Sequence, residues 1–180
     1  MKRCVFFDRD GVINRSPGPG RYVERWEDFE LLDGFVEALR VVRRHGWSAV
    51  VVTNQRCVAR GMVPMAELER IHAGLRRELA ARDGLTLLDI RVCPHDNGDA
   101  CACRKPRPGM LLDAARTHGL DLAASWMVGD SERDIEAGRA AGCRTIRVCE
   151  DEHEPTRADV RIASMADLAG TLDPLLASAV

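Results

Sequence analysis

The feature that most constrains the fold is a regular alternation of short apolar runs, rich in β-branched residues, with longer segments of helical periodicity. The short runs predict buried strands at residues 4–7, 48–53, 87–93, 126–128 and 145–149. Apolar residues recur at spacings of three and four in the predicted helices, at residues 34–45, 65–83, 108–118, 131–141 and 165–176. Strands that alternate with helices run parallel and are joined by crossovers. The sequence therefore predicts an α/β three-layer sandwich with a Rossmann-like parallel sheet.

Glycines mark the expected ends of four helices, because glycine readily adopts the left-handed conformation that closes a helix. They are Gly46, Gly84, Gly119 and Gly142. Two stretches do not fit the alternation. Residues 16–20 (SPGPG) form a turn-rich loop just after the first strand, and residues 94–108 are rich in Cys, Asp, Arg and Pro. Ligands of such folds bind at the carboxyl ends of the strands, so the segments that follow each strand are the places to look for a site.

Length and charge restrict the class of protein. A chain of 180 residues with 46% hydrophobic residues and no linker-like stretch predicts a single domain over residues 1–180. Arginines are scattered and the net charge is −2, which argues against a general nucleic-acid or membrane binder. There is no apolar run of about 18 residues, and Asp8 interrupts the N-terminal apolar stretch too early for a signal peptide. We expect a cytoplasmic protein and, without a long apolar stripe, a monomer.

The first predicted strand is followed by Asp8, Arg9, Asp10 and Gly11. Residues two apart in an extended segment point the same way, so we expect both carboxylates to face one point at the edge of the sheet. Two close carboxylates repel each other unless a cation lies between them, and a hard divalent ion such as Mg²⁺ suits carboxylate oxygens. Taken alone, the tetrapeptide fits an ordinary surface turn equally well.

Polar residues also follow the second and fourth strands. Thr53 and Asn54 end the second, and their hydroxyl and backbone N–H groups suit phosphate oxygens. Asp130 adds a third carboxylate after the fourth strand, and Asp134, one turn later, would orient the ligands of the metal. Each residue alone is more simply a strand-end or helix cap, but their occurrence at successive strand ends weakens that interpretation.

Residues 104–108 (RKPRP) place cations directly before a predicted helix. If Asp8 attacks phosphorus, a carboxylate must approach a dianion, at a cost of roughly 4 kcal/mol for each unit-charge pair about 4 Å apart at an effective dielectric near 20. A metal ion and the Lys105 ammonium together can offset that repulsion. The alternative, a basic surface loop, fits Arg107 better than Lys105.

Four metal-ligating residues lie close together in the segment 93–103. A set of three cysteines and one histidine predicts a closed, structural tetrahedral zinc site, formed by Cys93, His95, Cys101 and Cys103. The alternatives are unliganded cysteines or a disulfide, and the absence of a secretion signal argues against the disulfide. Because the loop ends beside Arg104 and Lys105, zinc would position these cations. Of the other cysteines, we expect Cys4, Cys143 and Cys149 in the core, whereas Cys57 is either reactive or merely packed.

Four segments together resemble the four motifs of the haloacid dehalogenase (HAD) superfamily of phosphatases. They are FFDRDGVI at residues 6–13, VTNQ at 52–55, RKP at 104–106 and VGDSERD at 128–134, and the resemblance spans residues 4 to about 150. It implies a HAD-like fold in which Asp8 forms a phospho-aspartate and Asp10 is first the general acid and then the base. It also implies Mg²⁺ held by the Asp8 and Asp130 side chains and the Asp10 carbonyl, with Thr53 and Lys105 steadying the phosphoryl group.

The zinc loop and the DRDG segment resemble two groups within the superfamily. These are the D-glycero-D-manno-heptose 1,7-bisphosphate 7-phosphatases of lipopolysaccharide precursor synthesis and the histidinol-phosphatases of histidine biosynthesis. Residues 58–61 (VARG) and the segment 103–111 favour the heptose group, whereas the short segment 96–100 resembles the histidinol group. We give the first signal more weight. A catalytically silent, zinc-stabilised scaffold is the alternative from a different class, and a phosphotransferase would differ only in the acceptor.

The expected substrate is a small phosphorylated metabolite that binds without a cap. Three departures from the heptose pattern lie near its pocket and bear on its identity: Arg56 and Cys57 replace a usual Ser-Gly, the loop 16–20 is longer, and Ser131 replaces a lysine found in some relatives. Arg56 and Arg104 are candidates for a second phosphate, because guanidinium matches phosphate geometry, although Arg56 fits a solvent-exposed role as well. The full set of expected substrate-binding residues is Asp8, Arg9, Asp10, Thr53, Asn54, Gln55, Arg56, Arg104 and Lys105.

Overall fold

A computed structural model describes residues 1–178, and its elements follow the predicted alternation. In chain order they are β1 (Cys4–Phe7), the 3₁₀ turn η1 (Trp26–Asp28), α1 (Asp33–Arg44), β2 (Ser48–Asn54), α2 (Met65–Ala81), β3 (Asp89–Cys93), α3 (Gly109–His118), β4 (Trp126–Gly129), α4 (Glu132–Ala141), β5 (Arg144–Val148), β6 (Val160–Ile162), the 3₁₀ turn η2 (Met165–Asp167) and α5 (Leu168–Ala177). All ten predicted elements are present, with η2 covering the start of the last helix. The final two positions of the predicted 1–180 domain lie outside the described residues.

The six strands form one parallel sheet in the order β3-β2-β1-β4-β5-β6. The central strand β1 pairs with β2 and β4, so that Val5 lies opposite Ala49 on one side and Trp126 on the other. The sequence analysis missed β6, whose Ile162 pairs with Val148 at the edge of the sheet. Three residues are too few to show a strand periodicity, and β6 exists because β5 offers it a free edge.

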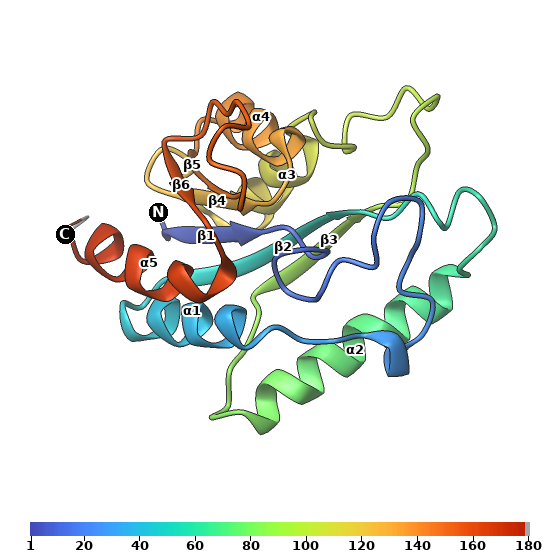
Figure 1. Ribbon diagram of the computed structural model, residues 1–180, viewed down its shortest axis with the longest axis horizontal. Coiled ribbons are helices and arrows are strands. Elements are labelled where there is room, and N and C mark those ends of the chain that lie inside the picture. Colours follow the sequence, from blue (N-terminus) through green and yellow to red (C-terminus); the bar gives the residue numbers. More distant parts are fainter. Residues whose placement is uncertain (179–180) are drawn as a thin grey trace.

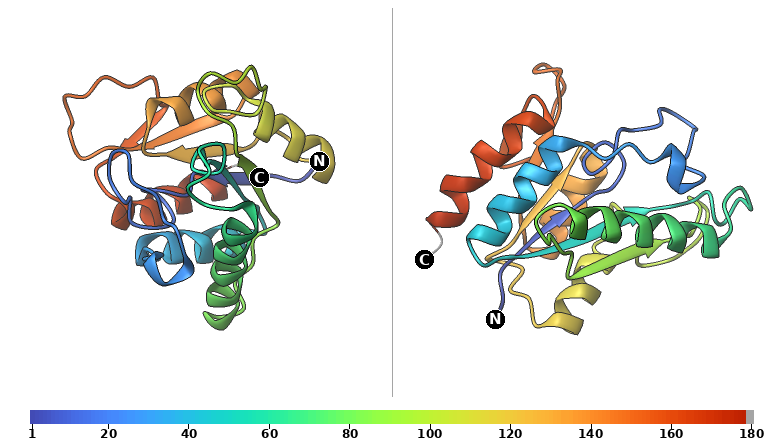
Figure 2. Two further views of the ribbon diagram at one scale, coloured as in Figure 1. Left: turned by 90° about the vertical axis from the view of Figure 1, so that its right-hand side faces the viewer. Right: turned by 90° about the horizontal axis from the view of Figure 1, so that it is seen from below.

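Helices cover both faces of the sheet, which gives the predicted three layers. Figure 1 shows α1, α2 and α5 on one face and α3 and α4 on the other, and Figure 2 shows α1 and α5 side by side. Successive residues of β1 alternate between these layers. Val5 and Phe7 belong to the core cluster under α1, α2 and α5, whereas Cys4 and Phe6 belong to the cluster under α3 and α4. All four are fully buried, and burying each large side chain contributes about 1.5–3 kcal/mol.

The carboxyl ends of β1, β2 and β4 meet at one end of the sheet, which faces the viewer in the left panel of Figure 2. Gly11 makes a close approach possible there. Its φ is 90°, and a Cβ atom at this position would lie 2.0 Å from Oδ2 of Asp130. Only glycine combines this backbone conformation with room for the carboxylate, so Gly11 allows the loop after β1 to pass against the end of β4.

The predicted helix ends are confirmed, since Gly46, Gly84, Gly119 and Gly142 all have positive φ values between 64° and 90°. The expected core positions of Cys4 and Cys143 are also confirmed, but that of Cys149 is wrong. Strand β5 ends at Val148, so Cys149 lies half-buried in the following loop, where its thiol donates to Asp151 O and Glu154 Oε2.

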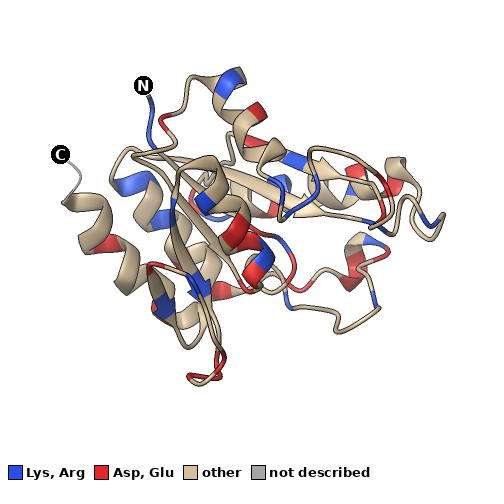
Figure 3. Ribbon diagram, turned by 90° about the horizontal axis from the view of Figure 1, so that it is seen from above, with Lys and Arg blue, Asp and Glu red and all other residues tan. Residues whose placement is uncertain are grey.

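Charged side chains of both signs are interspersed over helices and loops in the view of Figure 3. Within residues 1–178, no helix is both long enough and apolar enough to cross a membrane.

Candidate active site

Three carboxylates converge where β1 and β4 end. Asp8 follows β1, Asp130 follows β4, and Asp134 lies in the first turn of α4. One oxygen from each lies within 4.8 Å of the others. The Nζ atom of Lys105 lies 2.6 Å from Oδ1 of both Asp8 and Asp134, and it also donates to Val52 O at 2.8 Å. The sequence analysis expected this convergence from the strand ends, and the parallel sheet brings these residues together.

The cluster carries more negative than positive charge. Burial, reinforced by the charge of Asp134, raises the pKa of Asp8 to about 8 and that of Asp130 to about 7. Burial opposes the charge of Lys105, but Asp134 and Asp8 raise its pKa above the ordinary value. One ammonium thus faces three carboxylates. An oxygen donor set with this excess charge fits a hard divalent cation such as Mg²⁺.

Asp8 is also positioned to react with a substrate. Its backbone N–H donates to Val128 O at 2.9 Å, which fixes it beside β4. Its side chain is 14% exposed, whereas those of Lys105 and Asp134 are only 2% exposed. Of these three residues, Asp8 therefore offers the most accessible group.

The carboxylate of Asp10 does not face the same point as that of Asp8, which corrects the expectation from strand alternation. Strand β1 ends at Phe7, and the chain then turns so that Arg9 O accepts the N–H groups of residues 12–14. Asp10 accepts instead from Asn14 Nδ2 at 3.0 Å, Gln55 Nε2 at 2.9 Å and the Arg9 guanidinium. Burial alone would raise the pKa of Asp10, but the charge of Arg9 and these hydrogen bonds hold it below its ordinary value.

Arg9 was expected to bind substrate, but its side chain is fully buried. Its Nη2 donates to both carboxylate oxygens of Asp10, at 2.9 and 3.0 Å, and its Nε donates to Oδ1 at 3.2 Å. Its Nη1 lies 3.4 Å from Nε2 of His72, on α2. A contact with substrate needs an accessible guanidinium, so the structure gives Arg9 a role in holding Asp10 instead. The sequence analysis missed His72, because a single histidine on the buried side of a helix carries no signal of its own.

Two residues at the end of β2 support their neighbours. Gln55 is buried, and its Nε2 donates to Thr53 Oγ1 at 2.8 Å as well as to Asp10. Asn54 makes two bonds with the backbone of Lys105: its Oδ1 accepts from the N–H at 3.0 Å, and its Nδ2 donates to the carbonyl at 3.1 Å. Both were expected to bind substrate, and both have these side-chain atoms engaged within the protein.

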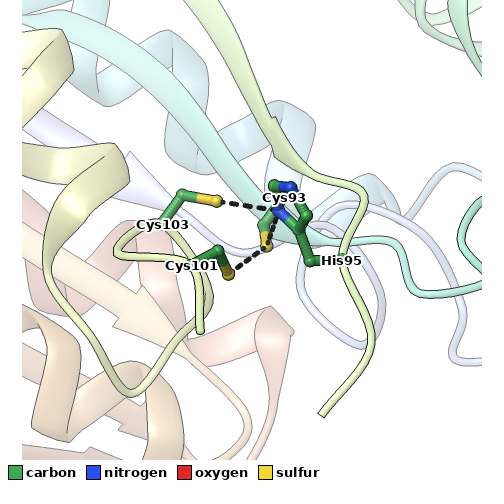
Figure 4. Close-up of side chains that lie close together, drawn as sticks. All are labelled: Cys93, His95, Cys101 and Cys103. Carbon is green, nitrogen blue, oxygen red and sulfur yellow. Dashed lines mark hydrogen bonds between the residues drawn. The ribbon is translucent and has the colours of Figure 1, made fainter. Parts of the chain in front are cut away.

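The predicted zinc ligands come together after β3, with their side chains pointing toward one another (Figure 4). Cys93 Sγ lies 3.5 Å from His95 Nδ1 and 3.7 Å from Cys101 Sγ, and Cys103 Sγ lies 3.3 Å from His95 Nδ1. Ligands around a tetrahedral zinc ion are separated by about 3.6–3.8 Å, given bond lengths of about 2.3 Å to sulfur and 2.0–2.1 Å to nitrogen. The four residues therefore fit such an ion, and none of the cysteines is in a disulfide.

A basic cavity of about 320 Å³ lies between this loop and the start of α4. Arg104 lines it, with its guanidinium donating to Asn97 Oδ1 at 3.0 Å and His95 O at 3.1 Å, so the loop of the cysteine cluster holds this arginine. The sequence analysis did not single out Arg133, although it lies within the segment 128–134. The lining residues are Asn97, Asp99, Arg104, Lys105, Pro106, Arg107 and Arg133.

Arg56 does not line this cavity. Its Nε donates to Tyr22 Oη at 2.6 Å, and its guanidinium lies 6.0 Å from the centre of the Tyr22 ring. Its neighbour Cys57 is fully buried, with its thiol 3.6 Å from Gln55 Oε1, and burial raises the pKa of that thiol. The structure therefore favours the interpretation of Cys57 as a packed residue over that of a reactive thiol.

Comparisons with known proteins agree with these observations. A family model described as HAD-hydrolase-like matches residues 102–172. The chain is 41% identical over 147 residues to the D-glycero-beta-D-manno-heptose-1,7-bisphosphate 7-phosphatase of Pseudomonas aeruginosa, covering 82% of this chain and 81% of that protein. It is 41% identical over 151 residues to the D-glycero-alpha-D-manno-heptose-1,7-bisphosphate 7-phosphatase of Mycobacterium bovis, covering 81% and 78%.

A solved structure gives the same result for the fold. The D,D-heptose 1,7-bisphosphate phosphatase of B. bronchiseptica, complexed with magnesium and phosphate, superposes with a TM-score of 0.84 at 34% identity. The match covers 94% of this chain and 97% of that one.

Proposed function

Because the chain belongs to the heptose bisphosphate phosphatase family of HAD-like hydrolases and is a phosphatase, we propose that it removes the 7-phosphate of D-glycero-D-manno-heptose 1,7-bisphosphate. The observation that carries this proposal is the basic cavity beside Lys105, at the same end of the sheet as Asp8. A bisphosphate needs a second anion site next to the reacting phosphate. Histidinol phosphate has one phosphate and would leave Arg104, Arg107 and Arg133 without an anionic ligand.

Asp8 is the proposed nucleophile. It attacks the phosphorus atom of the 7-phosphate, the bond from phosphorus to the sugar oxygen breaks, and a phospho-aspartate results. Lys105, 2.6 Å from Asp8, lowers the electrostatic cost of bringing a phosphate dianion to this carboxylate. Its backbone is fixed by Asn54, so the ammonium is in place before substrate arrives. The Thr53 hydroxyl lies at the end of β2 and is the proposed donor to a phosphoryl oxygen.

Asp10 is the proposed proton carrier. It gives a proton to the departing sugar oxygen and then takes one from the water that hydrolyses the phospho-aspartate. In this structure its carboxylate accepts hydrogen bonds from three side chains, which favours the ionised form suited to the second step. The first step requires Asp10 to acquire a proton.

Two metals complete the proposal. The side chains of Asp8 and Asp130 and the backbone carbonyl of Asp10 would hold Mg²⁺, with Asp134 supporting them through Lys105. The ion would neutralise charge on the phosphoryl oxygens. Zinc at the cysteine cluster would be structural and would fix the loop that carries Arg104. A monomer acting in the cytoplasm stays a prediction.

The test compares kcat/KM for phosphate release from heptose 1,7-bisphosphate and from L-histidinol phosphate, with Mg²⁺ present. We expect a preference of at least about 100-fold for the bisphosphate, which corresponds to about 2.7 kcal/mol of differential transition-state binding. Replacing Arg133 with alanine should reduce this preference, whereas the same change at Arg70, an exposed arginine on α2, should not. A preference for histidinol phosphate would overturn the substrate assignment, and equal weak activity on both would point to another phosphomonoester.

A further inference from the structure

A chain of buried contacts links α2 to the proposed proton carrier. His72 is 8% exposed and Arg9 is fully buried, and Nε2 of the histidine lies 3.4 Å from Nη1 of the arginine. On the opposite side of the same guanidinium, Nε and Nη2 donate hydrogen bonds to the Asp10 carboxylate. The planar guanidinium of Arg9 therefore connects α2 to the Asp10 carboxylate, which is the proposed proton carrier.

The chemistry of the pair fixes the state of the ring. Arginine has only N–H donors and stays charged in proteins, so Nε2 of His72 must be the acceptor of this contact. The ring is then neutral, with its proton on Nδ1. Burial and the positive charge of Arg9 agree with this assignment, since they lower the pKa of His72 to about 3. His72 also lines a surface cavity between α2 and β3.

We propose that His72 is a positioning residue, which holds the Arg9 guanidinium at the angle that places the Asp10 carboxylate for proton transfer. The proposal rests on the role given to Asp10 above. A guanidinium is rigid and planar, so an acceptor on Nη1 restrains the direction of Nε and Nη2 as well. Without His72, Nη1 is left buried without this partner, and Arg9 must tilt to satisfy it. The Asp10 carboxylate then loses the fixed donors of Arg9 and keeps those of Asn14 and Gln55.

Leaving groups distinguish positioning from simple packing. An alkyl phosphate needs a proton for its departing oxygen, whereas p-nitrophenyl phosphate releases a stable anion and depends little on the acid. In the His72→Leu variant, we expect kcat/KM to fall by at least about tenfold for an alkyl phosphomonoester and by less than about twofold for p-nitrophenyl phosphate. His72→Gln, whose side-chain oxygen can accept from Nη1, should restore the ratio of the two.

The matched control is Leu79→Ala, on the same helix and fully buried, which should lower the melting temperature without changing the ratio. An equal loss on both substrates in His72→Leu, no loss on either, or no restoration in His72→Gln would overturn the proposal. If the wild type hydrolyses neither substrate, the proposed function fails instead.

A measurement on the wild type tests the same geometry without any substitution. Nitrogen-15 NMR of the histidine rings should show His72 neutral between pH 5 and 8, with its proton on Nδ1. A proton on Nε2, or a charged ring at pH 6, would overturn the proposal even if the leucine variant does not fold or no substrate is turned over.

Discussion

Replacing Asp8 with asparagine should abolish turnover and, in magnesium-free buffer, make the protein more stable. Burial and the charge of Asp134 raise the pKa of Asp8 from 3.8 to about 8, so the folded protein carries this group protonated at pH 7 while the unfolded chain carries it ionised. Folding must therefore take up a proton. The difference of about three pH units between 7 and 3.8, at roughly 1.4 kcal/mol each, gives a cost on the order of 4 kcal/mol, which asparagine removes.

The sign follows from linkage. A carboxyl whose pKa is higher in the folded state loses folding stability as pH rises from about 4 to about 8. Urea unfolding of the wild type should therefore show stability falling across this range, and the curve of Asp8→Asn should be flatter. The buffer should contain no magnesium. It should also contain no chelator, because a chelator would remove metal from the cysteine cluster.

Glu136→Gln provides the control, because it removes one negative charge from an exposed site on α4. This variant should follow the wild type. The reasoning is refuted if Asp8→Asn is less stable than the wild type at pH 7 without magnesium, or if the two lose stability equally between pH 5 and 8.

Three further outcomes follow from the same geometry. Isothermal titration should show magnesium binding more tightly as pH rises from 6 to 8, because Asp8 and Asp130, with pKa values of about 8 and 7, must lose protons to bind it; a pH-independent affinity would contradict this. Gly11→Ala should cost about 1–3 kcal/mol of stability and weaken magnesium binding, since its Cβ would lie 2.0 Å from a carboxylate oxygen; urea unfolding and titration check both. Cys101→Ser should lower zinc content, measured by atomic emission, and kcat/KM for the bisphosphate at saturating magnesium, because the loop no longer fixes Arg104; unchanged activity with zinc lost would refute the link.

Much of the fold could be predicted because its signals are local. Apolar runs, helical periodicity and terminal glycines lie within a few residues of one another, and they locate five strands and five helices. The elements that the sequence analysis did not predict are those that depend on contacts with other parts of the fold. Strand β6 depends on the free edge of β5, and η1 depends on α2, where Gly74 leaves room for the ring of Trp26. A Cβ on Gly74 would lie 2.4 Å from that ring. No local pattern encodes such contacts.

The same distinction applies to the site. The convergence of Asp8 and Asp130 could be predicted, because parallel strands bring their carboxyl ends to one edge. The surroundings of Asp10 could not be predicted, because its partner Gln55 lies 45 residues away and the contact of Arg9 with His72 spans 63. Alternation along a strand also fails once the strand has ended, as it does at Phe7. The contacts of the Asp10 side chain therefore depend on the turn after β1 and on two elements that are distant in the sequence.

Two carboxylates only two residues apart thus have opposite electrostatic environments. Burial and neighbouring carboxylates raise the pKa of Asp8, whereas at Asp10 the charge of Arg9 and three side-chain donors overcome the effect of burial and lower the pKa. Arg9, between them in sequence, forms its ion pair with Asp10 and not with Asp8, so the repulsion at Asp8 remains for a divalent cation to offset. Enzymes commonly use environments that push two pKa values apart to assign different roles to like groups. In this protein the backbone turn after β1 creates that difference, because it places the Arg9 guanidinium against the Asp10 carboxylate.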